Sequence, residues 1–395
     1  MREDPVAARQ LGMLSLAMVL GMAPWFAATA VAPAIALELD LTSAQESWLT
    51  LAVQLGFVSG SLLSAGTLLS DVLSARRLAA ASALLAGLAT AGIAIVGIGA
   101  RGTIALRFLT GLALAGVYPP GIKIAAGWTR ERRGFAIGLL VGALTLGSAT
   151  PHLLRILPFA TGWRELLFAA AVSAFSSAAV FAALVREGPY QAPSSPFDPK
   201  AVGAVLADRG VRLATAGYLG HMWELYAMWS TAGLFFAHIA GIHGVAAPVA
   251  SVLAFATIAA GGVGCVLAGV WADRVGRSTV TIVAMAVSGS CALTVGALAV
   301  KSFALCVLVA ILWGIAIVAD SAQFSACVTE LAPRDYVGTA VTLQTALGFL
   351  LTMVTIRLVP VWADQIGWTW AYAPLAVGPL FGIVAMWKLR MERGV

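Results

Sequence analysis

The sequence predicts an all-α integral membrane protein with twelve transmembrane helices in two homologous halves. Of its 395 residues, 60% are apolar and only 11% are charged, and the mean hydropathy is +0.93. A soluble domain carries roughly a quarter charged residues, so too few charges are present here to coat a water-soluble fold. The apolar stretches reach the length of about 20 residues that crosses a bilayer. They lack the alternation of a β-barrel, which leaves helices.

Twelve apolar stretches can be placed along the chain. We expect spans at residues 11–36, 46–70, 78–100, 103–127, 134–158, 165–185, 211–237, 247–271, 278–299, 303–328, 337–359 and 369–388. The first is interpreted as a retained span, because it is long for a signal sequence and its removal would leave an odd number.

A polar, proline-rich stretch separates the sixth and seventh spans. It is interpreted as a linker that ends in a short amphipathic helix between Asp198 and Asp208. The predicted organisation is therefore an N-terminal six-helix bundle (1–185), a cytoplasmic linker (186–210) and a C-terminal six-helix bundle (211–395).

Positive charges are distributed unevenly between alternate loops. One set of loops, together with both termini, is rich in arginine, whereas the other holds little beyond Arg101, Arg164 and Lys301. Because cytoplasmic loops are enriched in Lys and Arg, both termini and the linker are predicted to be cytoplasmic, in a multi-pass protein of a bacterial inner membrane. The net charge of +6 thus reflects membrane topology, and we expect no nucleic-acid partner.

Two segments of the first half recur in the second half, one in a loop and one at the start of a span. The segment from Gly66 to Arg77 follows the second span, and a related segment from Gly269 to Arg277 follows the eighth. A second match, at the starts of the fifth and eleventh spans, has a similar separation of about 203 residues. A common separation at two places indicates an internal repeat.

The segment Gly269-Val-Trp-Ala-Asp273-Arg-Val-Gly276-Arg277 matches the G-x-x-x-D-x-x-G-R signature of the major facilitator superfamily, residue for residue. In the fourth span, Arg107 and Gly111 are similar to the R-x-x-x-G pattern of that family. The first-half copy of the loop signature departs from it, with Ser74 in place of glycine.

The whole chain therefore resembles a twelve-span transporter of this superfamily. The resemblance implies two pseudo-symmetric bundles around a central cavity and secondary active transport by alternating access. It also implies a monomer with no enzymatic activity and no cofactor. The resemblance does not name the solute.

The repeated loops supply candidate gating residues at the cytoplasmic ends of the helices. These are Asp71, Arg76 and Arg77 in the first half, and Asp273 and Arg277 in the second. An aspartate at one helix end beside an arginine at the next can form an ion pair that opens during alternating access. The alternative is a fixed topology anchor.

Glu224 and Asp320 are candidate proton-coupling residues within the spans. An ionisable group inside a membrane costs about 2.5 kcal/mol or more and is a functional candidate for that reason. A carboxyl group withdrawn from water can exchange its proton near neutral pH, and His221 lies one turn from Glu224. The alternative is a fixed buried ion pair that holds the spans together.

Arginine and histidine residues in the outer half of the spans predict an anionic or zwitterionic small-molecule substrate, because guanidinium groups suit carboxylates and phosphates. Snorkelling to the surface is the alternative for Arg155 and Arg357. The expected substrate-binding residues are Arg107, His152, Trp25, Gln54, Tyr118, His221, Gln323, Gln344 and Arg357. The predicted partners are this substrate, protons and the lipid bilayer.

Two other functions remain open. The first is a proton-coupled multidrug or organic-cation exporter with Glu224 and Asp320 as cation sites. The second is a copper importer that would use His221, Cys327 and methionines, whose soft ligands suit that metal. Methionine in an apolar helix is usually packing material, and we expect no metal site. No loop carries a catalytic or nucleotide-binding motif that would indicate an enzyme.

Overall fold

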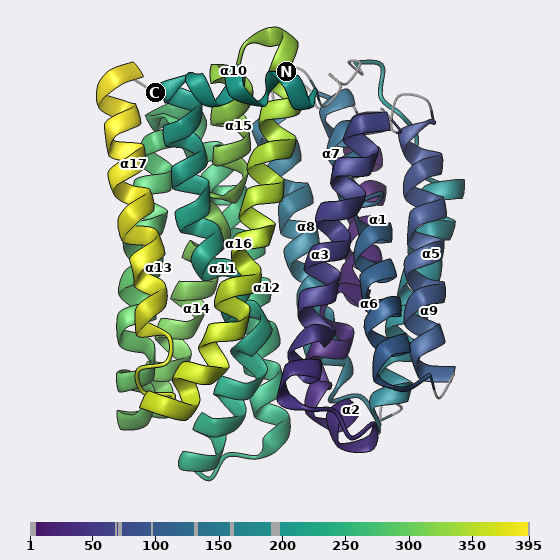
Figure 1. Ribbon diagram of the computed structural model, residues 1–395, viewed down its shortest axis with the longest axis vertical. Helices are drawn as coiled ribbons and strands as arrows, with labels where there is room; N and C mark the ends of the chain where they lie inside the picture. The colour runs from purple at the N-terminus through teal and green to yellow at the C-terminus, as the bar shows by residue number, and fades with distance from the viewer. Residues whose placement is uncertain are drawn as a thin grey trace. The chain divides into compact units, whose positions relative to one another are not determined.

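A computed structural model describes residues 5–67, 69, 73–95, 98–129, 133–158, 162–190 and 198–393, and these residues form helices and turns without a strand. The chain divides into two compact units, Met1–Pro196 and Phe197–Val395. Each unit is a bundle of long helices, as Figure 1 shows.

The N-terminal unit packs its longest helices in antiparallel and parallel pairs. Helix α1 contacts α8 and α9, α3 contacts α6, and α5 contacts α9. The helices are α1 (Pro5–Ala30), α2 (Ala32–Glu38), α3 (Ser43–Thr67), α5 (Ala75–Ile95), α6 (Gly99–Leu114), α7 (Tyr118–Gly127), α8 (Arg133–Leu154) and α9 (Trp163–Ala183).

The C-terminal unit has α11 at its centre, in contact with α12, α16 and α17, while α14 packs against α12 and α13. Its helices are η1 (Pro199–Ala201), α10 (Val202–Ala207), α11 (Arg209–Ile242), α12 (Ala247–Val275), α13 (Arg277–Lys301), α14 (Phe303–Ala319), α15 (Ser321–Leu331), η2 (Arg334–Tyr336), α16 (Val337–Ile366), η3 (Ala373–Ala376) and α17 (Val377–Arg393).

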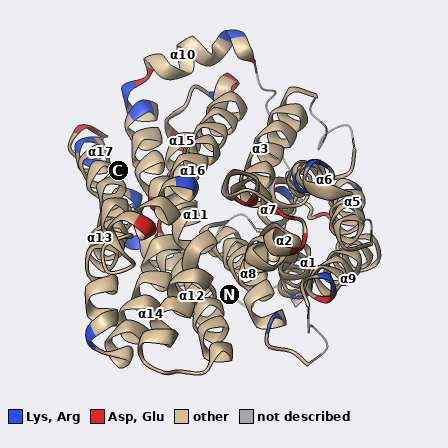
Figure 2. Cartoon of the chain, turned by 60° about the horizontal axis from the view of Figure 1, so that its bottom comes forward, with Lys and Arg blue, Asp and Glu red and all other residues tan. Residues whose placement is uncertain are grey.

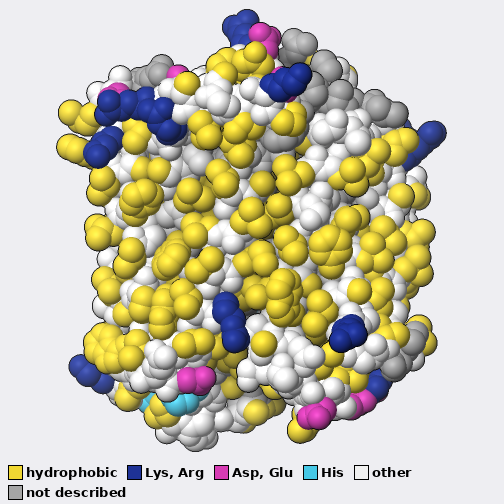
Figure 3. Space-filling model, viewed as in Figure 1, with side chains coloured by type: hydrophobic (Ala, Val, Ile, Leu, Met, Phe, Trp, Pro, Cys, Tyr) yellow, Lys and Arg dark blue, Asp and Glu magenta, His cyan; other side chains and the backbone are white. Residues whose placement is uncertain are grey.

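Eleven helical segments of the described chain are long and apolar enough to cross a membrane. Helix α17, with 17 residues, is shorter and follows them as a twelfth segment. On the face of each unit shown in Figure 3, hydrophobic side chains cover the middle of the helices. Most Lys, Arg, Asp and Glu residues lie at helix ends, as Figure 2 shows. This distribution is the one that a hydrocarbon layer between two aqueous phases imposes.

Several expected span boundaries differ from the structure, and those of the first and last spans are among them. The first span was expected at 11–36, but α1 ends at Ala30 and Pro33 lies in the first turn of a separate helix, α2. The last was expected at 369–388, but α17 begins at Val377. Gly367 ends α16 with a φ of 74°, and Pro374 lies at the start of η3, a position that suits proline.

The short helix expected between Asp198 and Asp208 is present as η1 and α10. Asp198 Oδ1 accepts a hydrogen bond from the backbone N–H of Lys200 at 2.8 Å. Asp208 Oδ1 accepts one from Val211 N–H at 2.9 Å and so caps α11.

The fourth and tenth spans are each broken into two helices. Helix α6 ends at Leu114 and α7 begins at Tyr118, whose successors Pro119 and Pro120 suit a helix start. Helix α14 ends at Ala319 and α15 begins at Ser321, which leaves Asp320 at the junction. Broken helices within a membrane are tolerated where they line a protein interior or a polar site.

Glycines bring two helix pairs to backbone contact at corresponding places of the two units. A Cβ atom on Gly111 of α6 would collide with the carbonyl oxygen of Val53 in α3, and one on Gly314 of α14 would collide with that of Thr257 in α12. Sequence separations of 203 (111 to 314) and 204 (53 to 257) relate these residues. A second pair of contacts repeats the arrangement: Gly60 with Leu112, and Gly264 with Ile315.

Candidate functional site

A buried carboxyl group lies in the middle of the C-terminal unit. Glu224 of α11 is 1% exposed. Its Oε1 accepts a hydrogen bond from the indole N–H of Trp313 in α14 at 2.6 Å. Its Oε2 accepts one from the hydroxyl of Ser288 in α13 at 2.9 Å. Three helices thus hold both carboxyl oxygens, which fixes the orientation of the group.

A histidine–aspartate pair lies close to this carboxyl group. His221 Nδ1 is 2.8 Å from Asp320 Oδ1, and both side chains are almost fully buried. The rings of Tyr218 and Phe324 lie 6.0 and 5.5 Å from the His221 ring, and no described residue bonds its Nε2. The break between α14 and α15 is what places Asp320 beside the continuous helix α11.

The two carboxyl groups and the imidazole lie close together, because His221 contacts Asp320 and is one turn from Glu224 on α11. Sequence reasoning had placed Glu224 and His221 on one helix and Asp320 on another without showing that they meet. Such a cluster can gain or lose a proton, since a buried charge is costly and protonation removes it.

In the second half, Arg277 forms an ion pair with Glu330, whereas the sequence predicted a pair with Asp273. Arg277 at the start of α13 donates to Glu330 of α15, with N–O distances of 2.6 to 3.0 Å. Its Nη1 donates to Gln323 Oε1 at 3.0 Å. Gln323, expected to bind substrate, therefore contacts Arg277, while Asp273 is exposed at the end of α12. Sequence reasoning missed Glu330, an acidic residue at the end of the tenth span.

The first half lacks an equivalent arrangement among its described residues. Asp71 lies outside the described residues. The backbone N–H of Arg76 donates a hydrogen bond to Glu187 Oε1 at 3.2 Å. The Nη1 of Arg76 donates a hydrogen bond to Ala182 O at 3.3 Å. The backbone N–H of Arg77 donates to Ser74 Oγ at 3.3 Å.

Arg107 of α6 is completely buried, and its guanidinium group binds the main chain. Its Nε donates to Leu49 O at 2.7 Å, its Nη1 to Pro24 O at 2.8 Å, and its Nη2 to Trp25 O at 2.5 Å. The three bonds tie α6 to α1 and α3 within the N-terminal unit. In this arrangement the guanidinium group stabilises the bundle, whereas sequence reasoning had expected it to bind an anion.

Several neutral polar side chains contain buried atoms without partners among the described residues, and the hydroxyl groups of Ser148, Thr257 and Ser278 are among them. Both amide atoms of Gln54 in α3 and of Gln344 in α16 are unpaired, as is Nδ1 of His152 in α8. Gln54 lies one turn from Phe57, whose ring is 4.9 Å from that of Trp25. Buried amides normally find hydrogen-bond partners, so these positions are candidates for contact with a ligand.

The remaining expected substrate residues lie at less enclosed places. Tyr118 is partly buried and begins α7, and Arg357 lies exposed on α16. Arg155, next to His152 on the sequence, donates from Nη1 to Ala30 O at 3.4 Å. Arg155 and Arg107 belong to the N-terminal unit and Arg357 to the C-terminal unit.

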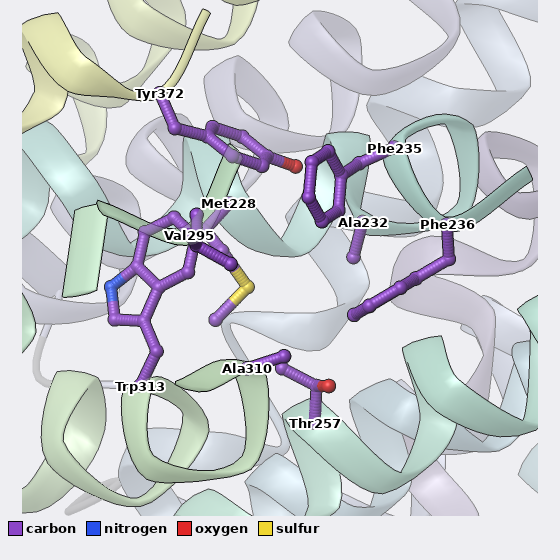
Figure 4. Close-up of a pocket in the computed structure, with 9 residues that line it drawn as sticks. All are labelled: Met228, Ala232, Phe235, Phe236, Thr257, Val295, Ala310, Trp313 and Tyr372. Carbon is purple, nitrogen blue, oxygen red and sulfur yellow. The ribbon is translucent and has the colours of Figure 1, made fainter. Parts of the chain in front are cut away.

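A narrow cavity lies beside the Glu224 site within the C-terminal unit (Figure 4). Its volume, taken as the space open to the centre of a water-sized sphere, is about 10 Å³. This volume is the lower limit for one water molecule. Its wall is mostly aromatic and aliphatic: Met228, Ala232, Phe235, Phe236, Thr257, Val295, Ala310, Trp313 and Tyr372. Trp313 therefore contacts the cavity with its ring and Glu224 with its N–H.

Comparison with known proteins places the chain in a family. The family model described as Major Facilitator Superfamily matches residues 13–237 and 222–394. No curated protein matches the sequence. Among solved structures, the fold is similar to that of the proton:xylose symporter XylE bound to 6-bromo-6-deoxy-D-glucose. The TM-score is 0.75 at 13% identity, over 98% of this chain and 96% of that one.

This likeness supports the twelve-helix fold predicted from the sequence. The two matches of the family model together span almost the whole chain and agree with the loop signature from Gly269 to Arg277. The protein is a multi-pass membrane transporter that belongs to the major facilitator superfamily.

Proposed function

We propose that this protein is a proton-coupled secondary transporter of a small polar solute, in which Glu224 takes up and releases the coupling proton. The observation that carries the proposal is the closed hydrogen-bond set around Glu224, between Trp313 and Ser288 in the interior of α11, α13 and α14. The proton:xylose symporter with the similar fold supports it as well.

The physical reason for coupling is the cost of a buried charge. An ionised Glu224 needs its two donors, because an unpaired carboxylate in a low-dielectric interior costs several kcal/mol. Protonation removes this requirement, so any conformation that separates Trp313 or Ser288 from Glu224 becomes more accessible to the protonated protein. A ligand shifts an equilibrium by its differential affinity for two states, and here the proton is that ligand.

We assign the neighbouring His221–Asp320 pair to the same proton-coupling site. The imidazole and carboxylate are 2.8 Å apart, and Asp320 interacts electrostatically with Glu224. His221 lies one turn from Glu224 on α11, so the pair adjoins the proposed proton site.

For the solute, we propose recognition by neutral hydrogen-bonding groups, with a zwitterionic or uncharged polar molecule as the cargo. Arg107, on which the prediction of an anion depended, has its guanidinium group bonded to three carbonyl oxygens. The unpaired buried groups include the amides of Gln54 and Gln344 and the imidazole of His152. An amide can donate and accept at once, which suits hydroxyl-bearing and zwitterionic solutes.

The cellular setting belongs to the same proposal. We expect a monomer in a bacterial inner membrane with both termini and the 186–210 linker in the cytoplasm, because the arginine-rich loops lie on one side of the predicted spans. Two six-helix bundles, 1–185 and 211–395, would then open a central cavity to each side of the membrane in turn.

Export of an organic cation is the second candidate, and it would use the same two carboxyl groups. The ring of Trp313 beside Glu224 provides an aromatic face of the kind that binds cations. For copper import, the described residues contain no group of three or more His, Cys, Asp or Glu that could hold a metal ion. The test below includes both ligand classes.

The test begins with a thermal-stability screen of the purified protein against sugars, amino acids, carboxylates, quaternary ammonium ions and copper. A ligand at 100 times its dissociation constant stabilises a protein by about 2.7 kcal/mol. We expect stabilisation by a sugar or a zwitterion and its loss in Gln54→Ala and Gln344→Ala. Gln365→Ala, at an exposed position of the same helix as Gln344, is the matched control.

The second step is transport by proteoliposomes of the solute found in the screen. A pH gradient should drive its accumulation in the wild type and in Glu165→Gln, which changes an exposed carboxyl group at the start of α9. In Glu224→Gln, accumulation should be lost while exchange of the solute continues. Gradient-driven accumulation by Glu224→Gln would exclude Glu224 as the coupling residue.

A further inference from the structure

The hydroxyl group of Ser288 has two acceptors and one hydrogen. It is 1% exposed, and its Oγ lies 2.9 Å from Glu224 Oε2 and 3.3 Å from the carbonyl oxygen of Met285, one turn earlier in α13. A serine hydroxyl donates one hydrogen bond and accepts others. It can therefore donate to Glu224 or to Met285, but not to both with full strength.

The opposite oxygen of the carboxyl group has no such freedom. Glu224 Oε1 accepts from Trp313 Nε1 at 2.6 Å, and an indole N–H can only donate. In the neutral acid the carbonyl oxygen is a better acceptor than the hydroxyl oxygen, so the N–H of Trp313 favours Oε1 as the carbonyl oxygen. A proton taken up by Glu224 therefore goes to Oε2, the oxygen that faces Ser288.

We propose that Ser288 is a positioning residue for proton exchange by Glu224, and that its hydroxyl group reverses direction as the proton arrives. With Glu224 ionised, the Ser288 O–H donates to Oε2. When a proton binds Oε2, the new carboxyl O–H donates to Ser288 Oγ and the serine hydrogen turns to Met285 O. The serine keeps its own hydrogen throughout, so the site gains one proton in total.

This arrangement leaves no polar atom of the pair unsatisfied in either charge state. An unpaired buried donor or acceptor is energetically costly, so a site with a fixed donor to Oε2 would favour one state strongly over the other. A hydroxyl that reverses direction reduces this bias. The inference rests on the proposed function, since it requires that Glu224 exchanges a proton.

Other titratable groups around Glu224 affect the same equilibrium. Among the described residues these are Asp320 at the α14–α15 junction, His221 on α11, and Cys291, which is one turn from Ser288 on α13. The helices α12, α16 and α17 carry their described charged side chains near their ends or at exposed positions: Asp273, Arg274, Arg357, Asp364, Lys388, Arg390 and Glu392.

The experiment is an infrared titration of the full chain in lipid nanodiscs, which follows the absorption of the protonated carboxyl group and needs no solute. Loss of a band in Glu224→Gln assigns it. In Ser288→Ala, the midpoint of this band should move to higher pH by about one unit, because the bond to the carboxylate is charge-assisted and stronger than the bond to the neutral acid.

Two further variants and a control distinguish positioning from packing. Ser288→Thr retains the hydroxyl and should titrate like the wild type, while Ser288→Cys, with a weaker donor, should give an intermediate midpoint. Ser290→Ala alters an exposed serine of α13 that bonds Ala286 O, and it should have no effect.

The outcomes separate this inference from the proposed function. A wild-type midpoint in Ser288→Ala, or the same displacement in Ser288→Thr as in Ser288→Ala, would overturn the role of the hydroxyl and leave Glu224 as the proton site. If no titrating band is lost in Glu224→Gln, both the proposed function and this inference are wrong.

Discussion

The two units carry different interiors at corresponding places of the same helix crossing. Arg107 of α6 and Ala310 of α14 are separated by 203 residues (107 to 310), and Pro24 and Met228 by 204 (24 to 228). In the N-terminal unit the guanidinium group of Arg107 binds the carbonyl of Pro24. In the C-terminal unit Ala310 and Met228 instead line the narrow cavity.

This difference indicates a division of roles between the halves. The three bonds of Arg107 hold α1, α3 and α6 together, and such a tied interior resists rearrangement. In the other unit the short side chain of Ala310 leaves space beside Trp313, which holds Glu224. The Glu224 site therefore lies beside a narrow cavity at the place where the other half has a buried guanidinium group.

The largest expected effect on stability comes from removing the three hydrogen bonds of Arg107. Arg107→Ala should lower the free energy of unfolding by about 3 kcal/mol or more, because a large buried side chain and its charge-assisted bonds are lost. Arg107→Lys should recover little, since an ammonium group lacks the planar fork that reaches several carbonyls. Thermal unfolding in detergent measures both variants.

Arg101→Ala is the control for this prediction, because Arg101 is exposed in the first turn of the same helix. It should change stability by less than about 0.5 kcal/mol. Wild-type stability of Arg107→Ala together with loss of anion binding would contradict the structural role and restore Arg107 to a substrate site.

An intermediate effect is expected from filling the cavity. Ala310→Val should raise the free energy of unfolding by about 1 kcal/mol, since added methyl groups occupy space that is otherwise empty. Ala113→Val, at a buried position of α6 in the N-terminal unit, should instead lower it by about 1 to 3 kcal/mol through overpacking. Equal responses of the two variants in chemical denaturation would show that the two cores are filled alike.

The smallest effect concerns a contact that only the N-terminal unit has. Glu38 of α2 accepts hydrogen bonds from Arg164 at 2.8 Å and Trp163 at 2.7 Å, whereas the residue 204 positions later is Ile242. The bond from Arg164, and then that from Trp163, lowers the pKa of Glu38 below its ordinary value of 4.5.

Because this pKa is lowered on folding, the stabilisation is present above pH 4.5 and is lost as the pH falls through the folded value. Glu38→Gln should therefore weaken the acid dependence of the thermal unfolding midpoint by a small amount. Glu46→Gln in the first turn of α3 should leave that dependence unchanged. An identical pH profile for Glu38→Gln and the wild type would exclude the contribution.

The helices of this protein were largely predictable because hydropathy and length determine a membrane span. Deviations occurred where local backbone chemistry prevails, as at Gly367, whose positive φ ends α16 before the last helix. Glu224 and Asp320 were also identifiable, since a carboxyl group inside an apolar stretch is conspicuous in the sequence.

The partners of these residues were less predictable. The role of Arg107 depends on main-chain carbonyls, which have no signature in the sequence. Ser288 was missed because the ninth span carries no charge away from its ends and so offered no ionisable candidate. A hydroxyl residue within such a span is a weak signal, and only the structure shows that it faces Glu224.

The glycine contacts have a mechanical consequence. Val53 O lies directly over Gly111, and Thr257 O lies directly over Gly314. Each carbonyl oxygen occupies space that only a glycine leaves open, and this restricts sliding of the two helices. If either helix slid along its partner, the oxygen would meet a residue with a side chain, and the helices would have to separate first. The helices of each pair, α3 with α6 and α12 with α14, should therefore move together as one rigid body during transport.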